Sequence, residues 1–281
     1  MPAGYGFDDF HPMRLVNIKK YGAVTSCELG WSFAGRPSWT VHVYVVDGIC
    51  IDTGQSRMRR WVLDFLKDFK LHRIVLTHHH EDHSGNAAAL NLARNIPVFG
   101  HPVAAQKMRV QNRILPYQHY MWGASAPVKV RHLPDRIVSD SVVLRSIFTP
   151  GHSKDHVAFF EEKNGWLFSG DLFLAERIKY FRSDESMKDQ IDSLKKVMTL
   201  DFQALFCAHN PKPADGKQRI AAKLLFLEEL YGTIQHLWKM GLSVDEITNA
   251  VGLKETYLIK IICMGNVSMK NMIRSAVNSF G

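Results

Sequence analysis

Apolar and polar residues follow two different rhythms along the chain, and the change of rhythm divides it. Between Leu15 and about Cys207, short runs of β-branched and aromatic residues alternate with short helical patterns. Such an alternation is typical of an α/β fold. Beyond Pro211 the apolar residues follow helical spacing alone. We therefore expect an α/β domain over residues 1–212 and an all-helical C-terminal subdomain over residues 213–281.

Turn residues place the individual elements of this pattern. The apolar runs 41–46 and 49–51 flank Asp47-Gly48, a pair typical of a tight β-hairpin turn. Further strand-like runs occur at 73–77, 96–99, 128–148, 156–169 and 204–207. Helical patterns occur at 57–69, 84–94, 102–112, 187–199, 215–240 and 243–251, and at 254–264 with a continuation to about 278.

The densest polar feature follows one of these predicted strands. Residues 77–85 read Thr-His-His-His-Glu-Asp-His-Ser-Gly, and they put four histidines and two carboxylates into the six positions 78–83. Imidazole nitrogens and carboxylate oxygens are the ligands of zinc and related transition metals. A purification tag would stand at a terminus and would carry no interleaved acids. The sequence therefore predicts a metal site where a buried strand ends.

Four other polar residues share this position at the end of an apolar run: Asp52, His152, Asp171 and His209. In layered α/β folds, the loops at strand ends collect reactive groups, because the sheet fixes them and the loop exposes them. We therefore expect these four side chains to join the histidine cluster.

In this order and at these spacings, the motifs resemble those of the metallo-β-lactamase superfamily. The matching motifs are IDTG, HxHxDH, PGHS, SGD and a last histidine, and they cover roughly residues 15–210. The resemblance implies an αββα sandwich, in which two mixed β-sheets are flanked by helices. It also implies two metal ions, the first held by His78, His80 and His152. The second would be held by Asp82, His83 and His209, with Asp171 bridging the two.

The same resemblance assigns the remaining polar residues near the cluster. Asp52 would hold the metal loop and orient a ligand imidazole without touching metal. Asp82 would be a catalytic residue as well as a ligand, as a partner for the proton of the nucleophile. His79 and Glu81 alternate with the ligands, so we expect them to point outward or to pack. His156 has no ligand role in the pattern and is expected to be a hydrogen-bonded polar residue.

Hydrolysis is the chemistry that this ligand set implies. Two divalent ions, Zn²⁺ by preference with Fe or Mn as alternatives, would lower the pKa of a bridging water from 15.7 toward roughly 7. The resulting hydroxide would attack a carbonyl or phosphoryl centre, and the metals would stabilise the oxyanion. His80 stands where the oxygen-reducing di-iron branch carries a glutamate, which counts against redox chemistry.

The predicted substrate-side loop, residues 172–182, leaves Asp171 directly. Four of its side chains are candidates for contact with a carboxylate, a phosphate or an oxyanion: Arg177, Lys179, Tyr180 and Arg182. The alternative is that some of them lie on a solvated strand face. Aromatic residues between Pro116 and Trp122 form either a pocket wall or core.

The substrate class has one favoured interpretation and two alternatives. We expect a small ester, thioester or lactone, anionic because the net charge is +8, with the helical tail packed over the metal site. Leu174 stands where the lactonase branch has a tyrosine, which weakens the lactone reading. Residues 242–253 have a pattern typical of a helix-turn-helix and resemble the tail of β-lactamase-like endoribonucleases. Plain helix packing also produces this pattern. A nucleic-acid phosphodiester is therefore one alternative, and a non-catalytic binding protein is the other.

Composition limits the compartment and the partners. The chain has no 18-residue uncharged apolar stretch, and residues 1–13 lack the apolar segment of a secretion signal. The four cysteines are far apart without CxxC spacing, so we expect no disulfide framework and a reducing, cytoplasmic location. We expect no membrane partner. The oligomeric state is not determined by the sequence, and a homodimer stays open.

Overall fold

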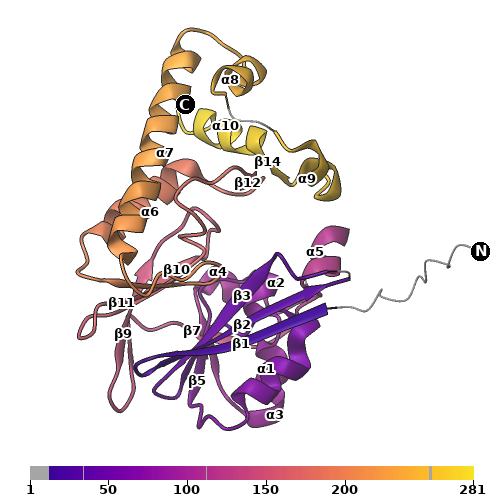
Figure 1. Cartoon of the computed structure of the whole chain (residues 1–281), viewed down its shortest axis with the longest axis vertical. Coiled ribbons are helices and arrows are strands. Elements are labelled where there is room, and N and C mark those ends of the chain that lie inside the picture. Colours follow the sequence, from indigo (N-terminus) through magenta and orange to yellow (C-terminus); the bar gives the residue numbers. More distant parts are fainter. Residues whose placement is uncertain (1–12, 34, 112, 253–254) are drawn as a thin grey trace, which may run out of the picture.

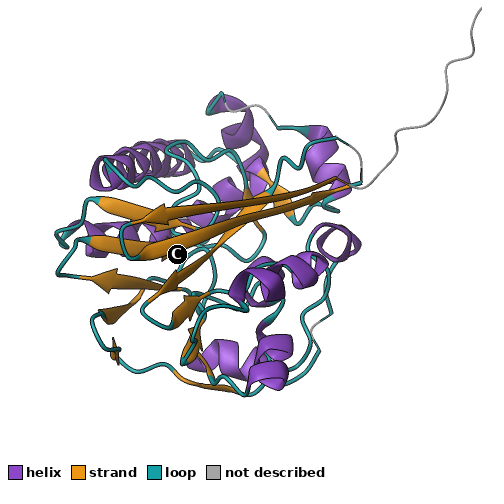
Figure 2. Ribbon diagram, turned by 60° about the horizontal axis from the view of Figure 1, so that its bottom comes forward, coloured by secondary structure: helices purple, strands orange, loops and turns teal. Residues whose placement is uncertain are grey.

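Two β-sheets form the centre of the protein, with helices outside them (Figures 1 and 2). The structure is a computed structural model, and it describes residues 13–33, 35–111, 113–252 and 255–281. The first sheet has the order β1-β2-β3-β4-β5-β6-β7. Its strands are β1 (Met13–Tyr21), β2 (Val24–Ser32), β3 (Thr40–Val46), β4 (Ile49–Ile51), β5 (Arg73–Val75), β6 (Val98–Gly100) and β7 (Val130–His132). Strands β1 to β4 pair antiparallel and β4 to β7 pair parallel.

The second sheet has the order β13-β11-β10-β9-β8. Its strands are β8 (Arg136–Val138), β9 (Val143–Phe148), β10 (Val157–Glu161), β11 (Trp166–Gly170) and β13 (Ala204–Cys207). Only the β11–β13 pair in this sheet is parallel; the other three are antiparallel. Both sheets are therefore mixed, as the sequence predicted.

Helices and short elements complete the chain. The N-terminal part contains η1 (Ser56–Met58), α1 (Arg59–Leu66), α2 (Glu81–Ser84), α3 (Ala87–Arg94), α4 (Pro102–Lys107) and α5 (Pro116–Met121). The C-terminal part contains β12 (Phe181–Arg182), α6 (Met187–Met198), α7 (Gly216–Lys239), α8 (Val244–Ala250), α9 (Tyr257–Ile262), β14 (Val267–Ser268) and α10 (Met269–Val277). At the β3–β4 hairpin, Asp47 and Gly48 have φ of 45° and 73°, the left-handed pair that a type I′ turn requires.

The period-two alternation of side chains along the strands builds three buried layers. In β3, Val43 faces the cluster beneath α1 and α3, while Tyr44 faces the cluster between the sheets. In β10, Phe159 joins the cluster between the sheets and Phe160 joins the cluster beneath α6 and α7. Helices thus cover the outer face of each sheet, which confirms the predicted αββα sandwich.

The C-terminal region is helical, as expected, but it differs from the sequence prediction in two ways. The helical pattern predicted to run from 254 to about 278 is interrupted, because Met264 and Gly265 have φ of 54° and 76° and end α9. The chain then forms β14, which pairs antiparallel with β12. Strand β12 belongs to the loop that follows Asp171, so the tail holds one end of that loop.

One hydrophobic cluster contains residues from both sides of the predicted boundary at 212. Leu205 of β13 and Ile220 and Leu227 of α7 belong to the same buried group. The helical tail therefore packs directly on the second sheet, and the division into 1–212 and 213–281 stays a prediction. Among the residues that the structure describes, no helix combines the length and apolar character needed to cross a membrane.

Candidate metal centre

All seven predicted metal-binding side chains come together at one end of the sandwich. His78 and His80 lie in the segment after β5, and Asp82 and His83 lie in α2. His152, Asp171 and His209 follow β9, β11 and β13. Two groups of possible ligand atoms form there, each within 4.8 Å: one is His78, His80 and His152, and the other is Asp82, His83, Asp171 and His209.

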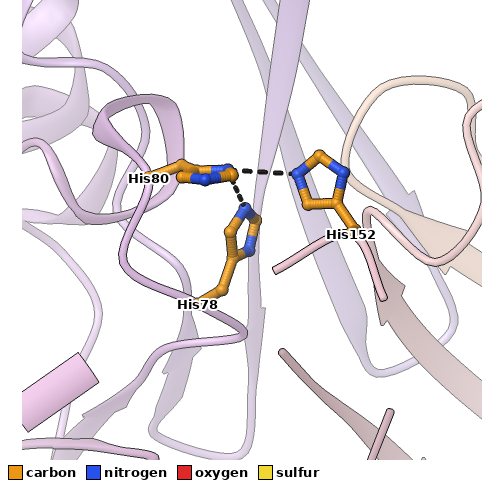
Figure 3. Close-up of side chains that lie close together, drawn as sticks. All are labelled: His78, His80 and His152. Carbon is orange, nitrogen blue, oxygen red and sulfur yellow. Dashed lines mark hydrogen bonds between the residues drawn. The ribbon is translucent and has the colours of Figure 1, made fainter. Parts of the chain in front are cut away.

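The first group consists of three imidazoles whose nitrogens face one another (Figure 3). The Nδ1 atom of His80 lies 2.8 Å from Nε2 of His78 and 3.1 Å from Nε2 of His152. All three rings are buried. The facing ring nitrogens carry lone pairs. These lone pairs repel one another unless a proton or a cation lies between them.

The second group mixes imidazoles with carboxylates. Nε2 of His209 lies 3.3 Å from Oδ2 of Asp82 and 3.3 Å from Oδ1 of Asp171. Nε2 of His83 lies 3.3 Å from the same Asp171 oxygen. The other Asp171 oxygen, Oδ2, lies 3.3 Å from Nε2 of His152 in the first group. Asp171 thus presents one oxygen to each group.

The donor atoms fit two divalent ions. His83 Nε2 and Asp171 Oδ1 are both buried, and neither has a hydrogen-bond partner. Buried polar atoms normally have a hydrogen-bond partner. A cation bound by both atoms would take the place of that missing partner. In a tetrahedral site with ligands at ~2.0–2.1 Å, neighbouring donor atoms are about 3.3–3.4 Å apart, close to the spacings found here. Nitrogen and oxygen donors suit zinc, iron and manganese alike.

Charge balance supports the same conclusion. Although burial opposes its ionisation, the facing imidazoles hold the pKa of Asp171 well below its usual range. Burial also disfavours a charged His209, yet Asp171 and Asp82 raise its pKa to about 10. The carboxylates therefore attract positive charge to the space between the two groups.

Hydrogen bonds on the far side of three rings fix which nitrogen faces the centre. Nδ1 of His83 is 2.8 Å from Oδ2 of Asp52, and Nδ1 of His209 is 2.6 Å from the Thr40 carbonyl oxygen. Nδ1 of His78 is 3.0 Å from Oγ1 of Thr77, which itself donates to Asp52. With Nδ1 as donor, each ring leaves the Nε2 lone pair directed into the centre.

Asp52 is the main anchor of this arrangement. Its carboxylate accepts hydrogen bonds from the Thr77 amide at 2.8 Å and from the Thr77 hydroxyl at 2.7 Å, in addition to its contact with His83. It does so from a backbone conformation with φ of 58°, which is uncommon for a residue other than glycine. Asp52 therefore lies behind the facing imidazoles and contacts one of them, His83, directly.

The residues set aside as non-ligands are built into the support. His156 bonds to the Thr149 hydroxyl through Nδ1 at 2.8 Å and accepts the Asp171 amide through Nε2 at 3.0 Å. Burial lowers its pKa to about 3, so the ring is neutral and can accept. His79 bonds to the buried Asp155, and Glu81 is buried and accepts from Gln118. His156 is thus hydrogen-bonded, and His79 and Glu81 pack.

A cavity of about 320 Å³ opens over the centre, lined by His80, Asp82, His152, Asp171 and His209 among others. Of the substrate-side candidates, Tyr180 and Arg182 line this cavity, and the Tyr180 hydroxyl also contacts that of Thr256. Arg177 and Lys179 are exposed and lie outside the lining. Tyr117 and Trp122 form part of its wall, so the aromatic segment borders the pocket.

Three residues that support or border the centre were not predicted from the sequence. Glu185 lines the cavity, with Oε2 3.5 Å from Nδ1 of His152. Trp39 lines it from the segment before β3. Lys223 of α7 is buried and donates at 2.7 Å to the carbonyl oxygen of Leu172, next to Asp171. None of them belongs to a motif. The one available signal was Lys223, because a lysine on the apolar face of a long helix indicates a buried polar contact.

The family model described as "Metallo-beta-lactamase superfamily" matches residues 39–209, more than half of the chain. The chain belongs to the metallo-β-lactamase superfamily. A solved metallo-β-lactamase family protein from Thermus thermophilus is similar in fold, with a TM-score of 0.64 at 19% identity, over 86% of this chain and 89% of that one.

Two curated superfamily relatives carry names with a stated activity. A hydroxyacylglutathione hydrolase of Bdellovibrio bacteriovorus is 32% identical over 57% of this chain. An atrochrysone carboxyl ACP thioesterase of Aspergillus fumigatus is 25% identical over 63% of this chain. The matched parts span 57% and 51% of these two proteins, respectively.

The contacts of Asp52 predict a loss of metal affinity in Asp52→Asn. An amide carries a donor on one side, so it cannot accept from the Thr77 amide, the Thr77 hydroxyl and His83 at the same time. We expect zinc affinity to fall about 10- to 100-fold, measured by competition with a chromophoric chelator. Asp64→Asn, which changes an exposed carboxylate of α1, is the control and should bind as the wild type does. Equal affinity in both variants would show that Asp52 does not orient His83.

Proposed function

We propose that the protein is a metal-dependent hydrolase of a small anionic ester or thioester. The observation that carries this proposal is the buried Asp171 carboxylate, which presents one oxygen to each of two groups of facing donor atoms. Such an arrangement suits two cations a few ångströms apart. The names of the two relatives support a thioester in particular, because both describe thioester hydrolysis or a thioesterase.

The two groups would hold the ions as the motifs imply: His78, His80 and His152 on the first, Asp82, His83 and His209 on the second, and Asp171 on both. We propose Zn²⁺ as the natural metal, because imidazoles supply five of the seven donor groups, and imidazole suits zinc better than manganese. Bound there, the ions would activate water at neutral pH and polarise the scissile carbonyl.

The chain's own residues supply the remaining parts of the reaction. Asp82 borders the cavity, so its carboxylate can accept the proton of an attacking water. Trp39 and Trp122, whose ring centroids are 6.2 Å apart, cover the side of the cavity near His209 and restrict water. Hydrogen bonds hold the rings of His78, His83 and His209 in one orientation from behind, so these rings need little reorganisation as charge develops.

Arg182 is the proposed contact for the negative charge of the substrate. It is the one lysine or arginine among the described residues that line the cavity. Its side chain is largely buried, and burial opposes its charge; the nearby Asp184, Tyr117 and Glu81 nevertheless raise its pKa. A guanidinium in that environment binds a carboxylate or phosphate by charge-assisted hydrogen bonds.

The two alternatives from the sequence have less support. The residues with the helix-turn-helix pattern form α8 and the segment after it, and Leu253 lies outside the described residues. A nucleic-acid substrate would require steep salt dependence of binding. A non-catalytic binding role would leave the polar donor atoms without a reaction to perform. A reducing, cytoplasmic setting remains our proposal, in keeping with four free cysteines, all of them buried.

The proposal predicts that Asp82→Ala abolishes turnover while the fold persists. We expect kcat/KM for a hydroxyacylglutathione thioester to fall at least about 100-fold, because the variant loses both a ligand and a proton acceptor. Chelation should remove the wild-type activity, and zinc should restore it. Asp64→Ala is the matched control, and circular dichroism checks the fold. Unchanged turnover in Asp82→Ala, or turnover that survives chelation, would contradict a hydrolase of this kind.

Arg182 gives a separate prediction about the substrate. Arg182→Ala should raise KM for an anionic thioester by roughly tenfold or more, the effect of losing a hydrogen bond to a charged group. An uncharged ester should be affected far less, and Arg182→Lys should recover part of the loss. Arg177→Ala changes an exposed arginine of the same loop and should leave KM unchanged. Equal effects on charged and uncharged substrates would rule out the anion contact.

A further inference from the structure

A second cavity, of about 730 Å³, lies beside the metal centre. One wall comes from the β2–β3 region and α5, including Trp31, Trp39 and Tyr120. The opposite wall comes from Ile259 and Ile262 of α9. In Figure 1, α9 in the yellow C-terminal part faces α5 in the magenta part, although more than 130 residues separate them in sequence. We call this cavity the apolar groove.

The apolar groove adjoins the cavity over the metal centre. Ser38, Trp39 and Tyr117 line both of them. A molecule whose reacting group lies between the two sets of metal-binding residues can therefore extend past Trp39 and Tyr117 into the groove. Its volume is in the range of a site for a drug-sized ligand.

The chemistry of the walls selects an uncharged occupant. No lysine, arginine, aspartate or glutamate is among the described residues that line the groove. Aromatic rings dominate one side, where Trp31 and Tyr120 pack edge to face with centroids 5.2 Å apart. Rings in this arrangement give a firm apolar wall for aliphatic or aromatic groups. A charged carrier group would be desolvated there without a partner.

Helix α9 also exposes apolar side chains beyond those that line the groove. Helix α9 has no buried residue, and five large apolar side chains at or near it are more than half exposed: Tyr257, Leu258, Ile261, Ile262 and Met264. A contiguous apolar surface of this kind marks a binding site more often than a plain surface. Because α9 forms a wall of the groove, an apolar ligand in the groove covers part of this surface.

We propose that the apolar groove holds a large apolar acyl group of the substrate, while the charged carrier of the thioester faces Arg182. The inference rests on the proposed function and names the substrate class of the same centre: thioesters of long or aromatic acyl groups. Water adds to the thioester carbonyl and the carbon–sulfur bond breaks. The products are a carboxylic acid and a thiol, so no oxidant or further reactant is needed.

The test uses the metal-loaded full chain and thioesters of one thiol, N-acetylcysteamine, with acetyl, butanoyl and octanoyl groups. Burial of a methylene gives about a fourfold change, so we expect kcat/KM to rise at least about tenfold from butanoyl to octanoyl. Ile262→Asp places a charge in the groove and should remove that gain, while acetyl turnover stays within about twofold of the wild type. Ile261→Asp is the matched control: Ile261 is the next residue, is 73% exposed and does not line the groove.

Each outcome decides between the two proposals. A flat dependence on acyl length, or equal effects of the two variants, overturns the groove proposal and leaves the hydrolase intact. If none of the thioesters is hydrolysed, the thioesterase proposal fails. Calorimetry with N-(2-acetamidoethyl)octanamide, in which an NH group replaces the thioester sulfur and resists hydrolysis, then tests the groove alone: binding at least tenfold weaker in Ile262→Asp than in Ile261→Asp supports it, and equal binding refutes it. A wild-type dimer that both variants dissociate in ultracentrifugation would instead make α9 an interface between copies, and would overturn the proposal.

Discussion

Crowding of buried lone pairs around Asp171 is the constraint on which the rest of the structure depends. Its two oxygens lie 3.3 Å from ring nitrogens of His83, His152 and His209, and one of these oxygens has no hydrogen-bond partner. Such an arrangement is costly unless cations neutralise it. The surrounding chain holds it in place: hydrogen bonds fix the rings of His83 and His209 on the side away from the centre, and the neutral ring of His156 accepts a hydrogen bond from the amide of Asp171.

The sandwich and the tail make different contributions to this centre. The strands deliver the metal-binding residues, because β5, β9, β11 and β13 all end near the same point. The tail shapes the space above them. Strand β14 pairs with β12 and fixes the backbone of Arg182, and Lys223 of α7 reaches back to the carbonyl beside Asp171. Variation in the tail could therefore change the substrate while the metal-binding residues stay in place.

Local patterns in the sequence predicted the sandwich and the convergence of the seven side chains, because strand periodicity and motif spacing are encoded over a few residues. The β1–β2 hairpin was not predicted, because Gly22, at the first position of its two-residue turn, is a weaker turn signal than the Asp47-Gly48 pair. Strands β12 and β14 were missed because two-residue strands form only through their partner. Glu185 and the apolar groove were also not predictable: Trp39 and Ile262 line the same cavity only because the tail folds back over the sandwich. Residues that act through tertiary contacts leave no pattern of their own.

The most direct test of a two-metal centre is anomalous X-ray diffraction from crystals of the protein purified without added metal, with data collected on both sides of the zinc, iron and manganese absorption edges. We expect two anomalous peaks. One lies among His78, His80 and His152, the other lies among Asp82, His83 and His209, and the Asp171 carboxylate is between them. A single peak, or none in protein that is active on a thioester, would contradict it.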